Sequence, residues 1–373
     1  MNEDRATRYH RSRRRVGLAS MVAAAVVLAV LLVSGRSQDL AAWARGVAAP
    51  LPRPLAAAAA VSLYAASLAL AWDLLSFPFV FYRSFLLDRK YGLTSESAGT
   101  WMADHLKALV LGLALTLGAA LAVHGAAWLS PAWWWLIVTG VFAIAAIAIA
   151  RVAPVWLMPI FYRFRPLDRA ALRERLLALS DRAGAPAIGV FEWGLGEKTS
   201  RANAALVGAG GTRRILVSDT LLKGYSDDEI EVILAHELSH HVHHDIWTSL
   251  AIETVVVAVA LLGAHLAILR ASPVLGLHGP ADLAALPVVV AAGGALSLLL
   301  APLSNAWSRR NEHRADRFAL TLTGRPAAFV SAMRRLGAQN LAEVRPPRMA
   351  FWFFHTHPTI EDRIARARGE KTA

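Results

Sequence analysis

The sequence contains no cysteine among its 373 residues. Disulfide bonds and thiolate metal ligands are therefore excluded, and any metal site must be built from His, Asp or Glu side chains. Charge is also scarce, since 18% of the residues are charged while 56% are hydrophobic. This balance is unusual for a water-soluble protein and directs attention to the stretches that lack charge altogether.

Several segments are almost free of charge over lengths that could cross a bilayer, which takes about 20 apolar residues in a helix. These segments are residues 16–35, 54–72, 108–150, 246–269 and 283–308. The third is long enough for two crossings and is interrupted by Ser130 and Pro131. We therefore expect six spans in a mainly α, multi-pass membrane helical bundle. Buried helices of a large soluble core are the alternative, but soluble helices seldom stay uncharged for so long.

Positive charge is gathered beside the expected spans. The net charge is +12, and the arginines that precede the first span are Arg5, Arg8, Arg11, Arg13, Arg14 and Arg15. The loops after the third and fifth spans contain no Lys or Arg. The positive-inside rule then places the N-terminus and the segments after spans two, four and six in the cytoplasm, although the first loop, with three arginines, fits less well. We interpret the basic excess as topology and contact with the lipid bilayer, and expect no nucleic-acid partner.

Between the fourth and fifth spans the pattern changes to that of a small α+β domain. Residues 167–182 have helical spacing, and short strand-like runs follow at 188–192, 204–207 and 215–218. The last two runs flank the glycine-rich segment 208–211, which predicts a hairpin.

A capped helix carries the motif that bears the chemistry. Ser226 and Glu229, three residues apart ahead of an apolar run, predict a capping box and a helix start. On this helix lie His236, Glu237 and His240, in the pattern H-E-x-x-H. Residues four apart share a helix face, so the two imidazoles can converge on one ion. Glu237 lies slightly to the side, where it can take a proton from a metal-bound water.

A third ligand is expected from a distant glutamate, because a catalytic zinc takes three protein ligands and leaves one position open. Glu312 supplies it, with Asp316 one helical turn later to brace a ligand histidine. Two spans separate His240 from Glu312, so both return to the same side of the membrane. Asp245 is a second candidate to hydrogen-bond a zinc histidine, or else an ordinary helix-end charge. A surface helix with salt bridges at 309–317 is the alternative to the metal site.

Four stretches together make the sequence similar to a known family. They are Phe77 to Gly92 (FPFVFYRSFLLDRKYG), Pro159 to Leu167 (PIFYRFRPL), His236 to His240 with Glu312 to Asp316, and His357 to Arg363 (HPTIEDR). The sequence resembles the type I CAAX prenyl endopeptidases and their bacterial relatives among the membrane zinc metallopeptidases, with HtpX-type proteases as more distant kin. Eukaryotic members have seven spans, whereas six are expected here.

The resemblance implies further roles. His357 would steady the tetrahedral intermediate and Arg363 would support the site, with the zinc in a chamber among the membrane helices. Residues 200–204 resemble the substrate-binding edge strand of the family, so Asn203 and Ala204 are expected to bind substrate. A buried hairpin strand in which Asn203 only shapes a turn is the alternative.

These inferences predict a membrane-embedded zinc metalloendopeptidase with one Zn²⁺ per chain, which hydrolyses peptides or membrane proteins with a zinc-activated water. Three parts are expected: a basic cytoplasmic N-terminus at 1–15, an N-terminal membrane domain with four spans at 16–164, and a zincin-like peptidase domain at 165–373, interrupted by two spans at about 246–269 and 283–308. The protein should lie in the cell membrane with its N-terminus and catalytic site on the cytoplasmic side.

Three alternatives are an HtpX-type quality-control protease, a metal transporter and an inactive membrane scaffold. A transporter should hold its ligands at mid-bilayer within the spans, whereas these lie outside them. The intact set of ligands and base disfavours a scaffold.

Overall fold

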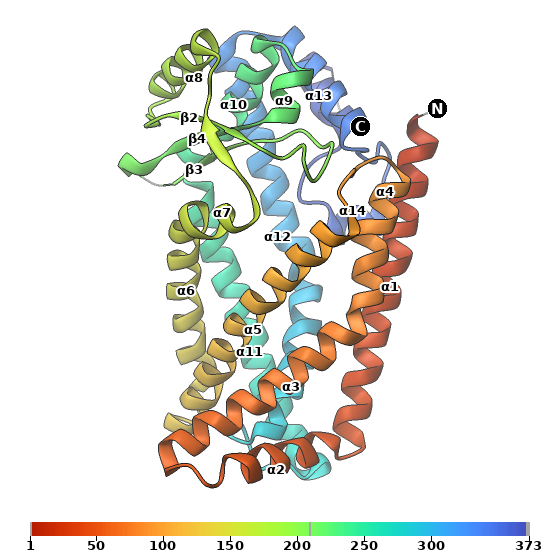
Figure 1. The fold of residues 1–373 in the computed structure, drawn as a ribbon, viewed down its shortest axis with the longest axis vertical. Helices are drawn as coiled ribbons and strands as arrows, with labels where there is room; N and C mark the ends of the chain where they lie inside the picture. Colours follow the sequence, from red (N-terminus) through yellow and green to blue (C-terminus); the bar gives the residue numbers. More distant parts are fainter. Residues whose placement is uncertain (1, 209, 371–373) are drawn as a thin grey trace.

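The computed structural model describes residues 2–208 and 210–370. Long helices form a bundle, and a small sheet with its covering helices lies at one end of it (Figure 1). The two ends of the chain lie toward that same end (Figure 1). Residues 1 and 371–373, at the limits of the expected first and last parts, lie outside the described residues, as does Ala209 in the expected turn.

Six described helices are long and apolar enough to cross a membrane. They are built on α1 (Asn2–Val33), α3 (Arg53–Phe81), α5 (Ala98–Leu129), α6 (Trp134–Val152), α11 (Asp245–Leu275) and α12 (Leu286–Thr323). The π-helical turns η1 (Tyr82–Leu86) and η2 (Ala153–Leu157) lead from α3 and α6 into α4 (Leu87–Lys90) and α7 (Met158–Phe161). The predicted six-span, multi-pass bundle is confirmed. Pro131 has no N–H for a helical ladder, in keeping with the break between α5 and α6.

The segment between the first two spans is not the loop that the charge pattern suggested. It forms α2 (Arg36–Ala48), which lies across the end of the bundle away from the sheet (Figure 1). The small side chains of Ala41, Ala44 and Ala48 are buried on its inner face, and α2 packs against α3. The hydroxyl of Ser37 also lies 2.7 Å from that of Tyr64 on α3. Close helix packing through alanines thus orders a segment whose arginines had suggested only a charged connection.

The sheet contains β1 (Phe164–Pro166), β2 (Val190–Trp193), β3 (Ala204–Val207) and β4 (Arg214–Ser218), in the order β1-β2-β4-β3. Strands β2 and β4 are parallel, and the other pairs are antiparallel. The predicted hairpin is confirmed, with β3 at the edge of the sheet. Gly208 is needed at its turn, because its φ is +87° and a Cβ there would lie 2.5 Å from the carbonyl oxygen of Thr212.

One face of the sheet is covered by α8 (Ala170–Arg182) and α10 (Asp227–Val242), whose apolar side chains share a core with β3 and β4. The predicted capping box is present at the start of α10, because Ser226 and Glu229 bond each other's backbone N–H groups. The remaining elements are α9 (Asp219–Gly224), η3 (Gly210–Thr212), η4 (Leu283–Ala285), α13 (Pro326–Gln339), α14 (Arg348–Phe354) and α15 (Ile360–Ala367).

Helix α12 continues without a break from the last span into the sheet end of the molecule, where it packs against α10. The candidate ligands of α10 and α12 therefore meet at one end of the bundle.

Candidate metal centre

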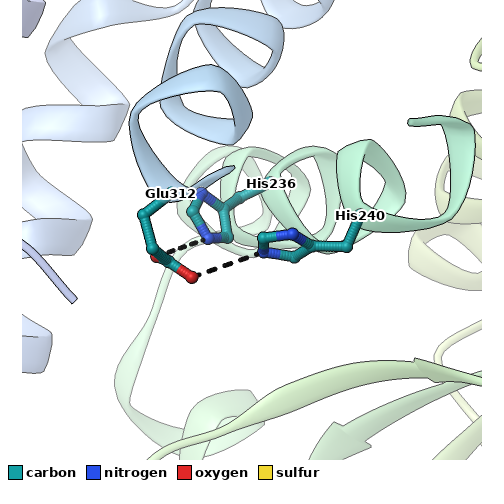
Figure 2. A group of neighbouring side chains, drawn as sticks. All are labelled: His236, His240 and Glu312. Atoms are coloured by element: carbon teal, nitrogen blue, oxygen red, sulfur yellow. Dashed lines mark ion pairs between the residues drawn. The ribbon is translucent and has the colours of Figure 1, made fainter. Parts of the chain in front are cut away.

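Two histidines of α10 and one glutamate of α12 point toward one another (Figure 2). The Nε2 atom of His236 lies 3.2 Å from Oε2 of Glu312, and the Nε2 atom of His240 lies 3.5 Å from Oε1 of Glu312. His236 and Glu312 are buried, while His240 is partly exposed. The structure thus brings together the three side chains that the sequence singled out as ligands.

These side chains fit a divalent metal. Bonds of about 2.0–2.1 Å in a tetrahedral site separate neighbouring ligand atoms by about 3.3 Å, close to the two distances above. Oε2 of Glu312 is buried and accepts no hydrogen bond from the described residues. A buried carboxylate oxygen without a donor is costly, and a cation between the carboxylate and the imidazoles would remove that cost. The donor set of two nitrogens and one carboxylate suits zinc among other divalent ions.

Two aspartates orient the histidines. Nδ1 of His236 lies 2.9 Å from Oδ1 of Asp316, and Nδ1 of His240 lies 2.9 Å from Oδ2 of Asp245. A carboxylate can only accept, so each Nδ1 carries a proton, and the Nε2 atom directed at Glu312 is the ring nitrogen left to bind a metal. Both aspartates are 4% exposed, which keeps water from competing for these bonds.

Each aspartate is in turn held by an arginine. The guanidinium of Arg363 binds Asp316 with two hydrogen bonds, from Nε to Oδ2 at 2.9 Å and from Nη2 to Oδ1 at 2.6 Å. Arg314 forms an ion pair with Asp245. The sequence prediction included Arg363 but missed Arg314, because residues two apart on a helix do not share a face and the spacing from Glu312 gave no signal.

The charges around α10 shift its ionisable groups. Burial and the nearby Arg363 favour a neutral His236, but the carboxylates of Asp316 and Glu312 outweigh them and raise the pKa of His236 to about 9. A metal that binds Nε2 must therefore displace a proton. Burial raises the pKa of Glu237, which moves this carboxylate toward the range suited to proton transfer near neutral pH.

His357 reaches the same carboxylate from the segment between α14 and α15. Its Nε2 lies 3.3 Å from Oε1 of Glu312, and its Nδ1 lies 2.8 Å from the hydroxyl of Thr356. The side chain is 62% exposed, so it borders the site from the accessible side.

Asn203 and Ala204 lie where β3 begins, on the edge strand. Asn203 is exposed, and its C=O accepts a hydrogen bond from the N–H of Ser218 at 2.9 Å. Ala204 is 3% exposed. The side chain of Asn203 is thus exposed at the edge of the sheet, while Ala204 is buried.

The other histidines of the motif region have different partners. Nε2 of His241 lies 2.7 Å from the C=O of Leu206 in β3, and Nδ1 of His243 lies 2.9 Å from the C=O of Ser239. His244 adopts a left-handed backbone conformation (φ 57°) ahead of α11. None of the three joins the group around Glu312 within the described part of the chain.

The chain matches two family models that together cover most of its length. Residues 166–371 match Peptidase family M48, and residues 2–163 match a model described as CAAX prenyl protease N-terminal, five membrane helices. In this chain residues 2–163 hold four of the long apolar helices and the shorter α2.

Relatives of the chain include proteins of a bacterium and of two yeasts. The chain is 29% identical to the uncharacterized metalloprotease YhfN of Bacillus subtilis, over 92% of this chain and 80% of that protein. It is 26% identical to the probable CAAX prenyl protease 1 of Schizosaccharomyces pombe, over 78% of this chain and 62% of the relative. It is also 26% identical to CAAX prenyl protease 1 of Saccharomyces cerevisiae, over 78% of this chain and 68% of that protein. The chain thus spans about two thirds of the length of these yeast relatives.

The crystal structure of S. mikatae Ste24p has the same fold, with a TM-score of 0.83 at 20% identity, over 98% of this chain and 88% of that one. Together the matches agree with the resemblance predicted from the motifs, and they favour a peptidase over a transporter or a scaffold.

Proposed function

The chain belongs to peptidase family M48 and is a membrane metalloprotease of the CAAX prenyl protease-like kind, and we propose that it is an endopeptidase whose metal is one Zn²⁺ held by His236, His240 and Glu312. The observation that carries this proposal is the orientation of both imidazoles, with Nδ1 bound to an aspartate and Nε2 directed at Glu312. Three such ligands leave one coordination position, as catalytic zinc sites require.

The surrounding residues divide the work of hydrolysis. When bound, zinc supplies a Lewis acid that polarises a carbonyl and lowers the pKa of water. Glu237 accepts a proton from the attacking water and returns it to the leaving amine. Nε2 of His357 donates a hydrogen bond to the oxyanion that develops on the scissile carbonyl.

Behind the ligands, two ion pairs fix the geometry. Asp316 and Asp245 hold the histidines in one tautomer, and Arg363 holds Asp316 in place. A ligand set that is oriented in advance loses less free energy when it binds the metal.

Substrate lies along β3. An extended peptide adds to the edge of the sheet with main-chain hydrogen bonds to Ala204, and the exposed amide of Asn203 bonds the peptide backbone near the scissile carbonyl. Main-chain recognition makes few demands on side chains, which suits peptides or membrane proteins of varied sequence as substrates.

The end of the bundle that carries the sheet faces the cytoplasm. The arginines ahead of the first span lie at this end of α1, and the loop after Arg270, at the other end, contains no Lys or Arg. Positive residues are retained on the cytoplasmic side of membrane proteins.

Replacement of Glu237 by Gln tests the proposal. An amide cannot accept the proton from water, so the purified Glu237→Gln protein should keep one zinc per chain and lose peptidase activity by about two to four orders of magnitude. Glu174→Gln on the exposed face of α8 is the matched control and should be as active as the wild type. Near-normal turnover by the zinc-loaded Glu237→Gln protein would show that another group is the base.

Natural substrates can be found with the same variant. Membranes from cells with the active protein should contain cleaved peptides or proteins that are intact in membranes with Glu237→Gln. Proteomics of the two membranes, compared at matched protein levels, identifies the sequences and the cleavage positions.

A further inference from the structure

The backbone groups of β3 alternate between the sheet and its free edge. Ser218 donates its N–H to the C=O of Asn203, so the odd-numbered residues of this segment face β4. The even-numbered residues Ala202, Ala204 and Leu206 therefore turn their N–H and C=O groups away from β4. No described strand lies beyond β3 on that side.

Two of these three residues already have hydrogen-bond partners. Oδ1 of Asn340 accepts from the N–H of Ala202 at 3.1 Å, and Nδ2 of Asn340 donates to the C=O of Ala202 at 3.4 Å. This side-chain amide makes the two bonds that one residue of an added strand would make. At the other end, Nε2 of His241 donates to the C=O of Leu206 at 2.7 Å.

We propose that Asn340 and His241 are specificity-determining residues that end the strand-addition site on either side of Ala204. This inference rests on the proposed endopeptidase function and its edge strand. Within the described part of this segment, only Ala204 has both its N–H and its C=O without a partner, and the N–H of Leu206 beside it has none either. A peptide can thus form a complete pair of main-chain bonds at one residue alone, and this fixes which of its peptide bonds lies at Glu237.

Ala204 is 3% exposed because its side chain packs in the core beneath the sheet. The restriction on a peptide therefore acts through the main chain of the edge strand, and it selects the register of the peptide without selecting its side chains.

Asn340 is held in place by an unusual helix end. It follows α13, and the next residue, Leu341, has a left-handed backbone conformation with φ 49°. The N–H of Ala342 bonds the C=O of Gly337 and that of Leu341 bonds the C=O of Ala338, which is the Schellman arrangement. Glycine is the usual residue at the left-handed position, because a Cβ is strained there.

Contacts with the N-terminal helix α1 explain why position 341 is a leucine and not a glycine. Its side chain is 6% exposed and packs in a cluster with Ala6 and Tyr9 of α1. Nε2 of His10 donates to the C=O of Leu341 at 2.8 Å, and Arg14 forms an ion pair with the buried Glu343. The first helix of the chain therefore fixes the loop that carries Asn340 against the substrate strand.

An N-methyl scan of a peptide substrate tests the proposal. The probe is a quenched fluorescent decapeptide, selected from a random library for cleavage by the full-length, zinc-loaded wild type in nanodiscs. Each backbone N–H is replaced in turn by N–CH₃, and kcat/KM is measured. In the wild type, N-methylation of the N–H that pairs with the C=O of Ala204 should lower kcat/KM by at least tenfold.

The variants should each gain one sensitive position. Asn340→Ala frees the C=O of Ala202, which can then accept from a second N–H of the peptide, two residues from the first. N-methylation of this second N–H should lower kcat/KM of the variant by at least fivefold. His241→Ala frees the C=O of Leu206 and should add a sensitive N–H on the opposite side, while His241→Gln, which keeps a donor, should not. Gln339→Ala is the control for Asn340, because it removes a neighbouring amide that bonds Ser200 and leaves Asn340 intact.

The outcomes separate this inference from the function on which it rests. If both alanine variants have normal zinc content and melting temperature and show the same N-methyl profile of kcat/KM as the wild type, the proposed role of Asn340 and His241 is wrong. If Asn340→Ala does not fold, Asn340→Asp is used in its place. Its carboxylate still accepts from the N–H of Ala202 but cannot donate to the C=O of Ala202, so the same second N–H of the peptide must become sensitive to N-methylation. A zinc-loaded wild type that cleaves no peptide of the library contradicts the proposed function itself.

Discussion

Replacement of Asp316 by Asn should separate two roles of one buried carboxylate. Asp316 accepts the Nδ1 proton of His236 and also neutralises Arg363, and the two partners lie on different elements. Asparagine has the same shape, and its oxygen can still face one partner, but it carries no charge. The variant should therefore bind metal less tightly and also fold less stably, for two different reasons.

The magnitudes follow from burial. Loss of the group that orients a ligand histidine typically weakens metal binding about 10- to 100-fold. Asp316 and Arg363 are 4% and 8% exposed, so removal of the carboxylate leaves the guanidinium buried without its counter-charge. Such a change costs about 3–5 kcal/mol of stability. Asp245→Asn is the matched control, because Arg314 is 35% exposed and water can solvate it.

Two measurements distinguish the effects. Competition with a chromophoric chelator gives the zinc affinity, and the unfolding midpoint of the metal-free protein gives its stability. Both single variants should lose zinc affinity by a similar factor, while only Asp316→Asn should lose several kcal/mol of stability. Adding Arg363→Met to Asp316→Asn removes the stranded charge and should restore most of the stability without restoring the zinc affinity.

Two results would refute this reasoning. Equal destabilisation by Asp316→Asn and Asp245→Asn would show that burial of the arginine does not set the cost. A double variant that is no more stable than Asp316→Asn would show that the guanidinium is not the source of the loss.

Other predictions address the reaction and the topology. His357→Phe should lower kcat by about 10²- to 10³-fold in steady-state assays at unchanged zinc content, and an effect on KM alone would contradict its role at the oxyanion. Asn203→Ala should lower kcat/KM by about 5- to 100-fold at unchanged melting temperature, whereas unchanged kinetics in the stable protein would remove it from the substrate site. Single cysteines at Lys223 and Arg368 should be protected from an impermeant maleimide in intact cells, with a cysteine at His278 labelled. Labelling at Lys223 would reverse the proposed orientation.

The grouping of His236, His240 and Glu312 could be predicted because each step of the inference is local or topological. Two residues four apart on a helix share a face whatever the tertiary fold. Counting charge-free segments between His240 and Glu312 then places both on one side of the membrane. The capping box, the hairpin and the six spans could be predicted for the same reason, since each depends on neighbouring residues.

The contacts that could not be predicted join residues far apart in the chain at spacings that carry no signal. Asn340 meets Ala202 across 138 positions, and Arg14 meets Glu343 across 329. The N-terminal arginines had a sufficient explanation in membrane orientation, so nothing in the pattern indicated that some also bind the peptidase part. Helix α2 was missed because its stabilising feature, alanine packing against α3, depends on a partner surface.

Helix α12 is both a membrane span and the support of Glu312. At a rise of 1.5 Å per residue, the 26 steps from Leu286 to Glu312 (312 − 286) place the carboxylate about 39 Å along the axis. A change in tilt of about 2° at the far end would move it by about 1.4 Å, against a tolerance of about 0.2 Å in metal–ligand distances. Membrane helices tilt to match the hydrophobic thickness of the lipid around them. We therefore expect a bilayer of the wrong thickness to weaken metal binding through the position of Glu312, although the lipid contacts none of the ligands.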